Sequence, residues 1–562
     1  MRRFLNDAKV FDSNRVLRYI AEIGQFHRIQ GSKDLVEAAR LIEKELEKYG
    51  LNPKLYGETY DGKTEYLTFK SPVAWDVVRG SVEVLGERLD TSISPLVVMA
   101  HSPSGETEGD VLHIKGDSDW ENADGKIVLV GEEWRNAYRK ANESGAVGFM
   151  AYRRGTGEHI PYIGLFLTKN DGWARIPAVA VPETLAGRII GKLSSGERVK
   201  ARIEVGAELH TRQTLPVLYA EVGEPPFILF TAHLCHPKPG ANDNASGSAM
   251  LLELARILGT LHSDSDRFGF AFLWIPEYYG TAAFIERHAD LSKYYTVINL
   301  DMVAGSPDRS GSTIMLVRTP LSRFSVVSGL LEYYLSLANG RGSDLAGNPL
   351  PGVPFRAYPY EMGSDHDLFN FFGVPAVMPI TWPDRFYHSS GDTVDKVSGE
   401  VVSIIGRAVL AASLALSRAT PGELERFARG YSMKYLGELA MELETGVAER
   451  LVMRGVARDS RFLGFKLGYG FDDRPWLEWR EKGVLSAEFI RRKKEGLAGE
   501  YERLTREAKV RTQLHELLML GEMLPREEAF KALGEEYGEV DGEKLGRLVE
   551  VLEKAGVISV LG

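Results

Sequence analysis

Cysteine, glutamine and long apolar runs are scarce or missing in this chain of 562 residues. Cys235 is the single cysteine, which excludes an internal disulfide framework and favours a reducing compartment. Glutamine occurs at only four positions while Glu, Lys and Arg are plentiful, a bias typical of proteins from hot environments. No apolar run approaches the roughly 20 residues needed to span a bilayer, and no secretory signal is visible. We therefore expect a cytoplasmic protein without a membrane partner.

The composition indicates a globular protein of several domains. Hydrophobic residues make up 44% and charged residues 26% of a chain that is too long for one ordinary domain. The formal net charge of −10 argues against a nucleic-acid binder, which normally carries a broad basic face. Nucleic acid is therefore not an expected partner.

The spacing of apolar residues divides the chain into segments of different structure. Two amphipathic helices are predicted between residues 14 and 50, separated by Gly31-Ser32, with Ser32 as the cap of the second. A β-rich module follows, with strands expected at 80–85, 96–99, 126–130 and 178–181 and a helix at 137–145. Apolar strands then alternate with helices: strands at 227–231, 268–275, 295–300 and 376–378, and helices at 246–258, 282–286 and 401–416. This alternation predicts an α/β fold with a mixed, mostly parallel sheet between helices.

The C-terminal part is predicted to be helical and highly charged from 423 to 507. It ends in helices at 512–520, 526–537 and 542–555 and a strand at 557–560, an order that resembles a winged-helix domain. The expected domains are 1–80 with 210–418, an insert at 81–209, a helical region at 419–508 and a winged-helix-like domain at 509–562.

Two histidines and three carboxylates stand where chemistry is expected in such a sheet. His233, Glu277 and Asp301 each follow a predicted strand, Asp243 lies in a Gly-Ala-Asn-Asp-Asn-Ala-Ser-Gly loop, and His388 precedes the last long helix. Imidazole and carboxylate are ligands that suit Zn²⁺. Two neighbouring metals need one shared carboxylate, and a further carboxylate must take a proton from the attacking water. Each residue alone is more often structural, but together they form the inventory of a two-zinc hydrolase.

These residues, in this order, show a likeness to a known family. The runs around His233, Asp243, Glu277, Asp301 and His388 resemble the co-catalytic zinc aminopeptidases, which include leucyl aminopeptidases, aminopeptidase Y, glutamate carboxypeptidase and glutaminyl cyclase. The insert resembles a protease-associated domain in its runs 125–130, 144–148 and 176–181. The tail resembles a subgroup of aminopeptidase-like proteins that end in a winged helix.

The resemblance assigns roles to the site residues. It implies that Asp243 bridges two metals, that His233 and Asp301 hold one of them, and that His388 holds the other. It also implies that Asp365 lines the substrate side of the site, facing the free amine. The implied cofactor is Zn²⁺, one or two ions per chain, with Co²⁺ or Mn²⁺ as alternatives.

The sequence departs from the family pattern at two points. The Asp that usually follows the first His by two residues is replaced by Cys235, so His233 needs another partner, and the adjacent His236 is its rival as a ligand. The usual Glu-Glu pair is reduced to Glu277-Tyr278. Alignment on the preceding strand makes Glu277 the general base, whereas a gap placed differently makes Glu277 a metal ligand. Glu361 is a candidate for the missing carboxylate.

The sequence therefore predicts a metallo-aminopeptidase that removes N-terminal residues from peptides through a metal-activated water. A carboxypeptidase or a glutaminyl-cyclase-like enzyme on the same fold is the alternative within enzymes. A carboxypeptidase needs an arginine for the substrate carboxylate, and the core motifs offer only Arg356 and Arg385. The other alternative is a ligand-sensing regulatory protein that uses its winged helix. We expect a homo-oligomer assembled through the C-terminal region.

Overall fold

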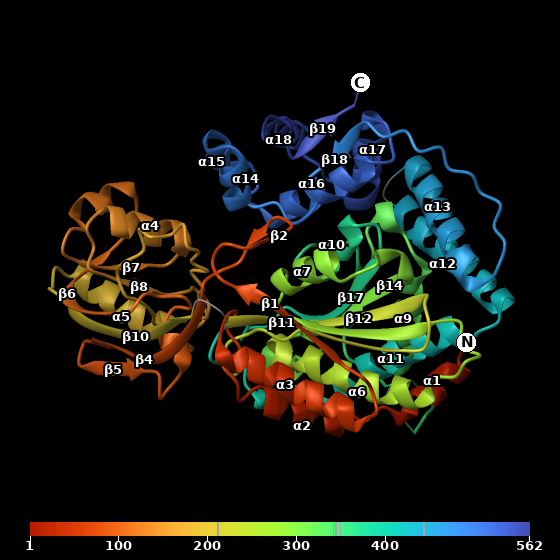
Figure 1. The fold of residues 1–562 in the computed structure, drawn as a ribbon, viewed down its shortest axis with the longest axis horizontal. Coiled ribbons are helices and arrows are strands. Elements are labelled where there is room, and N and C mark those ends of the chain that lie inside the picture. Colours follow the sequence, from red (N-terminus) through yellow and green to blue (C-terminus); the bar gives the residue numbers. More distant parts are fainter. Residues whose placement is uncertain (211–212, 341, 343–344, 349, 442–443, 562) are drawn as a thin grey trace.

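The chain folds around two sheets with separate hydrophobic cores. The computed structural model describes residues 1–562 except 211–212, 341, 343–344, 349, 442–443 and 562. The larger sheet has helices on both faces, the smaller sheet lies beside it in a module of its own, and a helical region lies above the larger sheet (Figure 1).

The larger sheet has eight strands in the order β1-β11-β13-β12-β14-β17-β15-β16. Its strands are β1 Lys54–Tyr60, β11 Gln213–Val222, β12 Phe227–His233, β13 Gly269–Ile275, β14 Tyr294–Asn299, β15 Thr313–Val317, β16 Phe355–Tyr358 and β17 Ala376–Trp382. The pairs β12–β13, β12–β14, β14–β17 and β15–β16 are parallel, and the pairs β1–β11, β11–β13 and β15–β17 are antiparallel. The four strands predicted from the sequence form the parallel centre, which confirms a mixed α/β fold.

Helices cover this sheet from both sides (Figure 1). Below it lie α2 Ser13–Ile23, α3 Lys33–Lys48 and α6 Gly247–Leu261, and above it lie α7 Tyr279–Arg287 and α10 His366–Phe371. The remaining helices of this domain are α1 Arg3–Asp7, α8 Pro307–Ser310, α9 Val326–Ala338 and α11 Gly399–Arg418. As predicted, Ser32 caps α3, because its Oγ accepts a hydrogen bond from the backbone N–H of Leu35 at 3.2 Å.

Among the described residues, one helix, α11, is long and apolar enough to cross a bilayer, judged by length and composition alone. No apolar segment of this length was expected from the sequence. However, 78% of its apolar window is buried inside the fold. Burial of this kind is what a core helix requires, since a helix that is apolar all round must be covered on every side.

The inserted module contains the seven-stranded sheet β5-β4-β10-β6-β7-β8-β9. Its elements are β4 Ala74–Val84, β5 Glu87–Asp90, β6 Gly105–His113, β7 Ile127–Val130, α4 Trp134–Glu143, β8 Gly148–Ala151, β9 Ala178–Ala180, α5 Glu183–Ser194 and β10 Lys200–His210. The sheet therefore starts at Ala74, earlier than the boundary expected at residue 81. A short hairpin, β2 Glu65–Tyr66 and β3 Phe69–Lys70, precedes it.

Two local expectations were wrong. In place of the strand expected at 96–99 there is a 3₁₀ turn, Pro95–Val97, because Ser94 caps it and Pro95 occupies its first position, and only an isolated bridge from Val98 to Val179 follows. The helical region expected from 423 to 507 is interrupted after Gly464, which ends α13 in a left-handed conformation with φ of 78°. The segment that follows is irregular and contains the strand β18 Leu477–Trp479.

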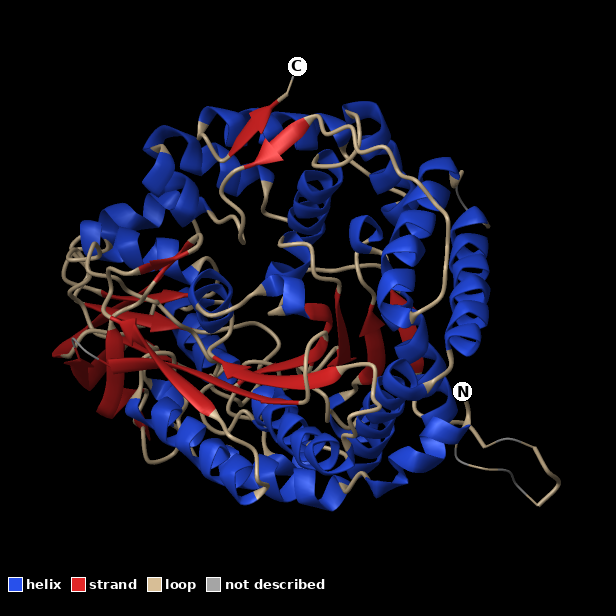
Figure 2. Ribbon diagram, turned by 45° about the vertical axis from the view of Figure 1, so that its right-hand side comes forward, coloured by secondary structure: helices blue, strands red, loops and turns tan. Residues whose placement is uncertain are grey.

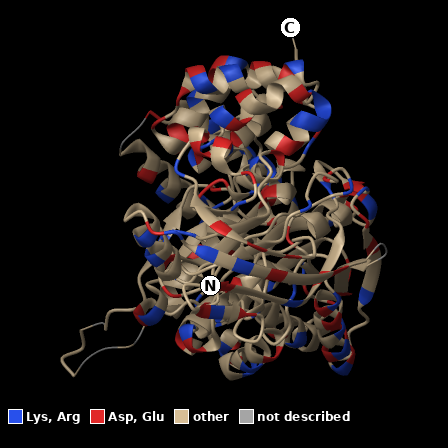
Figure 3. Cartoon of the chain, turned by 90° about the vertical axis from the view of Figure 1, so that its left-hand side faces the viewer, with Lys and Arg blue, Asp and Glu red and all other residues tan. Residues whose placement is uncertain are grey.

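The C-terminal region begins with α12 Pro421–Ala440 and α13 Gly446–Leu463 and continues with α14 Ala487–Lys493 and α15 Glu495–Leu504. Its last elements are α16 Ala508–Gly521, α17 Arg526–Tyr537, α18 Gly542–Lys554 and β19 Ile558–Val560, in the order predicted. β19 pairs with β18 in a two-stranded antiparallel sheet beside the C-terminus (Figure 2). Acidic and basic residues are interspersed along these outer helices (Figure 3), so no single sign of charge dominates them.

Candidate metal centre

The predicted site residues meet at one edge of the larger sheet because their strands are parallel. His233 is the last residue of β12, Glu277 follows β13, and Asp301 follows β14. β12 pairs in parallel with both neighbours, so the carboxyl ends of all three strands lie together. The loop of Asp243 opens α6, and the loop of His388 follows β17.

The first group joins His233, Asp243 and Asp301. Nε2 of His233 lies 3.2 Å from Oδ1 of Asp301 and 3.4 Å from Oδ1 of Asp243. Nδ1 of His233 donates to the backbone carbonyl of Cys235 at 3.0 Å, which supplies the partner that the missing Asp leaves open. Since a carbonyl only accepts, Nδ1 carries the hydrogen and Nε2 is free to bind a metal.

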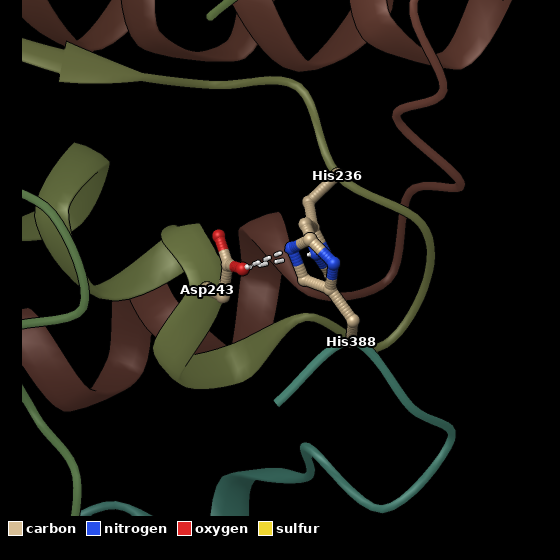
Figure 4. A group of neighbouring side chains, drawn as sticks. All are labelled: His236, Asp243 and His388. Carbon is tan, nitrogen blue, oxygen red and sulfur yellow. Dashed lines mark ion pairs between the residues drawn. The ribbon is translucent and has the colours of Figure 1, made fainter. Parts of the chain in front are cut away.

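The second group joins His236, Asp243 and His388 (Figure 4). Nε2 of His236 lies 3.2 Å, and Nε2 of His388 3.1 Å, from the same atom, Oδ2 of Asp243. Nδ1 of His236 donates to the carbonyl oxygen of Pro237 at 3.2 Å, so the buried Nε2 carries no hydrogen and faces Oδ2 of Asp243 without a hydrogen bond. His233 and His236, which the sequence left as rivals, thus face different oxygens of one carboxylate.

Asp392 fixes the backbone that carries the shared carboxylate. Its Oδ1 and Oδ2 accept hydrogen bonds from the backbone N–H groups of Asn242 at 2.8 Å and Asp243 at 2.9 Å. Burial raises the pKa of Asp392 to about 8, against the opposing effect of these two hydrogen bonds. The sequence offered the Gly-Asp-Thr run that contains Asp392 but gave no indication of this role.

The polar residues of the Asp243 loop tie it to the segment after Asp301. Side-chain oxygens of Asn242, Asn244 and Ser246 accept hydrogen bonds from the backbone N–H groups of residues 304, 302 and 303, respectively, at 3.0–3.1 Å. The loop sequence therefore serves to hold Asp243 and Asp301 beside each other.

Glu277 lines a cavity beside the two groups but belongs to neither group of metal ligands found among the described residues. Its backbone N–H donates to Sγ of Cys235 at 3.1 Å, and its carbonyl accepts from Nε2 of Gln30 at 3.1 Å. Burial raises the pKa of Glu277 well above its ordinary value, His233 opposes this, and the charges of neighbouring aspartates add to it. A raised pKa of this kind is typical of a residue that exchanges protons.

Tyr278, which stands where the family has a second Glu, is directed to a different partner. Its hydroxyl donates to Oδ2 of Asp367 at 2.8 Å, and its backbone N–H donates to Oδ1 of Asp365 at 2.8 Å. Asp365 also accepts from the hydroxyl of Thr281. Asp365, which directly precedes α10, is fully buried against the start of α7. It is not among the described residues that line the cavity, so its substrate-facing role stays a prediction.

The cavity beside the two groups has a volume of about 330 Å³. Its walls are largely apolar and include four methionines, Met302, Met315, Met362 and Met378. Trp382 and Tyr387 also line it, and the ring of Tyr387 stacks on that of His388 at 3.7 Å. Glu361 lies in the wall but in neither ligand group among the described residues. Ala508, at the start of α16, brings the C-terminal region to the cavity, which the sequence did not indicate.

The donor set fits two divalent metals. The three atoms of each group lie within 4.8 Å of one another, and the carboxylate of Asp243 belongs to both groups. Four acidic residues, Asp243, Glu277, Asp301 and Glu361, line the cavity, and a cluster of negative charge of this kind suits divalent cations. Nε2 of buried His236 and Oδ2 of Asp243 face each other at 3.2 Å without a hydrogen bond, and two facing acceptors of this kind suit a cation bound between them.

A mixed sheet whose strand ends gather two histidine–carboxylate groups around one aspartate defines the class of co-catalytic metallohydrolases. Residues 219–413, about a third of the chain, match the family model described as Peptidase family M28.

Known peptidases are similar to this chain in sequence and in structure. Aminopeptidase YwaD of Bacillus subtilis is 25% identical over 318 residues, and the match spans 52% of this chain and 62% of that protein. The structure of BSAP, a zinc aminopeptidase from Bacillus subtilis, matches 73% of this chain and 96% of its own with a TM-score of 0.53 and 18% identity. A putative peptidase from Clostridium acetobutylicum matches 100% of this chain and 99% of its own, with a TM-score of 0.53 and 12% identity. At these identities the two structures show a shared fold.

Proposed function

We propose that the chain is a zinc-dependent aminopeptidase. The observation that carries the proposal is the shared carboxylate: both oxygens of Asp243 are approached by histidines, Oδ1 by His233 and Oδ2 by His236 and His388. The names of two similar proteins, Aminopeptidase YwaD and the zinc aminopeptidase BSAP, support the same activity and metal.

The proposed ligand sets follow the two groups. His233, Asp243 and Asp301 hold one zinc ion, and His236, Asp243 and His388 hold the other. When bound, the ions supply Lewis-acid chemistry, polarising the scissile carbonyl and lowering the pKa of a water molecule towards about 7.

Glu277 is the proposed general base. It lines the cavity without belonging to either ligand set of the described residues, so its carboxylate is free to exchange a proton. It takes a proton from the attacking water and passes it to the leaving amine. His236 supplies the ligand that the family takes from a second Glu, which leaves Glu277 to this role.

The proposed substrate is a peptide with a free amino terminus and an apolar first side chain. The acidic cluster attracts an ammonium group, and the methionine-lined wall accepts an apolar side chain of varied shape. The chain offers no comparable arginine cluster among the residues that line this cavity in the described structure, which favours amino-terminal over carboxyl-terminal recognition.

The test combines metal analysis with a panel of aminoacyl-arylamides, before and after chelation. Two zinc ions per chain and chelator-sensitive hydrolysis are the expected results. Glu277→Gln is expected to keep both metals and lose about 10²–10⁴-fold in kcat, the usual contribution of a general base. The matched control is Glu286→Gln, an exposed glutamate on the following helix α7.

Two outcomes would contradict the proposal. Loss of a metal in Glu277→Gln would make Glu277 a ligand and place the base elsewhere. A protein that binds metal but hydrolyses no free-amine substrate would favour the carboxypeptidase, cyclase or regulatory alternatives.

We propose further properties that rest on the sequence. The module at 74–210 resembles a protease-associated domain, and the elements from α16 to β19 resemble a winged helix that serves protein contacts. A cytoplasmic homo-oligomer remains our proposal, and sedimentation of the purified chain tests its subunit number.

A further inference from the structure

A loop of the inserted module is joined to the loop that carries His388. The backbone N–H of Tyr162 donates to the carbonyl of His388 at 2.7 Å. Ser390 donates its backbone N–H to the carbonyl of Ile160 at 2.9 Å, and its Oγ accepts the N–H of Ile160 at 3.0 Å. Pro161 and Ser389 lie opposite each other in an antiparallel bridge. The module thus pairs as a short strand with the loop of a proposed metal ligand.

His388 needs such support because its backbone is strained. Its φ is +52°, in the left-handed region that side chains other than glycine rarely adopt. A conformation of this kind persists only where the surrounding contacts hold it. The hydrogen bond from the backbone N–H of Tyr162 to the carbonyl of His388 is one of these contacts.

The ring of Tyr162 contacts both histidines of the second group. It lies edge-on to His236, with ring centroids 5.3 Å apart at 70°, and to His388, with centroids 5.4 Å apart at 64°. The two imidazoles are themselves 5.2 Å apart. One aromatic side chain therefore fixes the orientation of both rings whose Nε2 atoms face Oδ2 of Asp243.

We infer that Tyr162 is a positioning residue for the second metal, and that the inserted module is in this way a structural part of the metal centre. The inference rests on the proposed function, because it requires that His236 and His388 bind a metal. The ring of Tyr162 contacts His236 and His388 of the second group, whereas no ring contact with His233 of the first group is found in the described structure. Loss of Tyr162 should therefore weaken one metal position and spare the other.

The test uses the full chain stripped of metal and titrated with Co²⁺. Metal per chain after dialysis and the visible absorption of bound Co²⁺ are both measured. The wild type is expected to bind two ions. Tyr162→Ala is expected to bind the first as before and the second about 10–100-fold more weakly, the usual cost of losing an outer partner of a metal ligand. Tyr162→Phe keeps the ring and should restore the second binding step.

Two further variants separate positioning from docking of the module. Ser390→Ala removes a hydrogen bond of the same loop contact without touching the ring, and should leave the second binding step within a few-fold of wild type. Tyr162→Leu keeps apolar bulk without an aromatic edge, and it stands in for Tyr162→Ala if the smaller side chain prevents folding. Its second binding step should be weakened as well.

The outcomes distinguish this inference from the proposed function. Unchanged binding of both ions in folded Tyr162→Ala or Tyr162→Leu would overturn the inference alone. Equal weakening of both ions would also overturn it, because the effect would then be general. A wild-type chain that binds no Co²⁺ would overturn the proposed function, and this inference with it.

Discussion

Nε2 of His236 lies 3.2 Å from Oδ2 of Asp243, while Nδ1 of the same ring is held by the carbonyl of Pro237. We propose that His236 takes the place of the second Glu of the resembled family, where this chain has Tyr278. A neutral imidazole there would give the second position one negative charge fewer than a carboxylate. Tyr278 itself donates its hydroxyl to Asp367.

His236→Ala should remove one metal and leave the other. Its Nε2 belongs to the group around Oδ2 of Asp243, so the second ion should bind more weakly by more than the roughly 10–100-fold that loss of an outer partner costs. Calorimetric titration of the metal-free protein measures both steps. The control is His288→Gln, a histidine that pairs with Glu58 away from the site. If His236→Ala binds two ions with wild-type affinity, His236 is not a ligand.

Arg28→Lys should destabilise the protein and loosen the loop that carries His236. The buried guanidinium donates to four backbone carbonyls, those of residues 23, 26, 234 and 240, at 2.6–3.2 Å. A lysine ammonium has three donors at one point and cannot reach all four. Each carbonyl left unpaired costs about 1–3 kcal/mol, so the midpoint of thermal unfolding should fall clearly.

The exposed Arg40→Lys on α3 is the control for this substitution, because it keeps a surface charge beside Glu37. It should leave the unfolding midpoint nearly unchanged, since exposed ion pairs contribute little. Equal midpoints for the two variants would show that the contacts of Arg28 do not limit stability.

The strand-end residues were predictable from the sequence because their positions depend on local patterns. Each apolar run ends in a polar residue, and parallel strands bring such ends together, which places His233, Glu277 and Asp301 at one edge. The second ligand set was harder to predict. In the sequence, His236 looks like an ordinary loop histidine. Its approach to Oδ2 of Asp243 depends on how two loops fold, which no local pattern specifies.

The contacts of Tyr162 and Ala508 with the site could not be predicted from the sequence. Tyr162 and Ala508 reach the site from the insert and the C-terminal region, and neither lies in a run with a recognisable period. The prediction of a strand at 96–99 was wrong for a local reason. The cap at Ser94 and the proline after it favour a 3₁₀ turn more than the β-branched residues that follow favour a strand. Local sequence patterns thus predicted the residues at the strand ends, whereas the residues that surround them depend on tertiary packing.

Ala508→Trp should change substrate preference without removing metal. Ala508 lines the cavity from the first turn of α16, and an indole there would occupy space that a long substrate side chain needs. We expect kcat/KM for large apolar arylamides to fall about tenfold or more, within the range for poorly fitting side chains, and that for alanyl-arylamide to change little. The control is Ala440→Trp at the exposed end of α12. A uniform loss across the panel would contradict a role of this wall in selection.

Glu536→Gln should alter how stability depends on pH. Glu536 and Glu516 are buried together where α16 and α17 meet residues 321–322: Glu536 accepts from the N–H of Leu321 at 3.2 Å, and Glu516 from that of Ser322 at 2.9 Å. Burial, and then the charge of Glu516, raises the pKa of Glu536 well above its ordinary value. Burial also raises the pKa of Glu516 to about 7.

The sign follows from proton binding. Between about pH 4.5, where an unfolded Glu loses its proton, and the raised pKa in the folded state, the folded chain holds more protons than the unfolded one. The free energy of unfolding therefore falls as pH rises through this window, by up to about 1.4 kcal/mol per pH unit for each such group. A glutamine at position 536 mimics the protonated acid at every pH, so the variant should gain stability over wild type as pH rises from 5 to 8. Hydrogen exchange of the amides in α16 and α17 measures this difference, with exposed Glu527→Gln on the same helix as the control. Parallel pH curves for Glu536→Gln and wild type would show that Glu536 does not retain its proton in the folded chain.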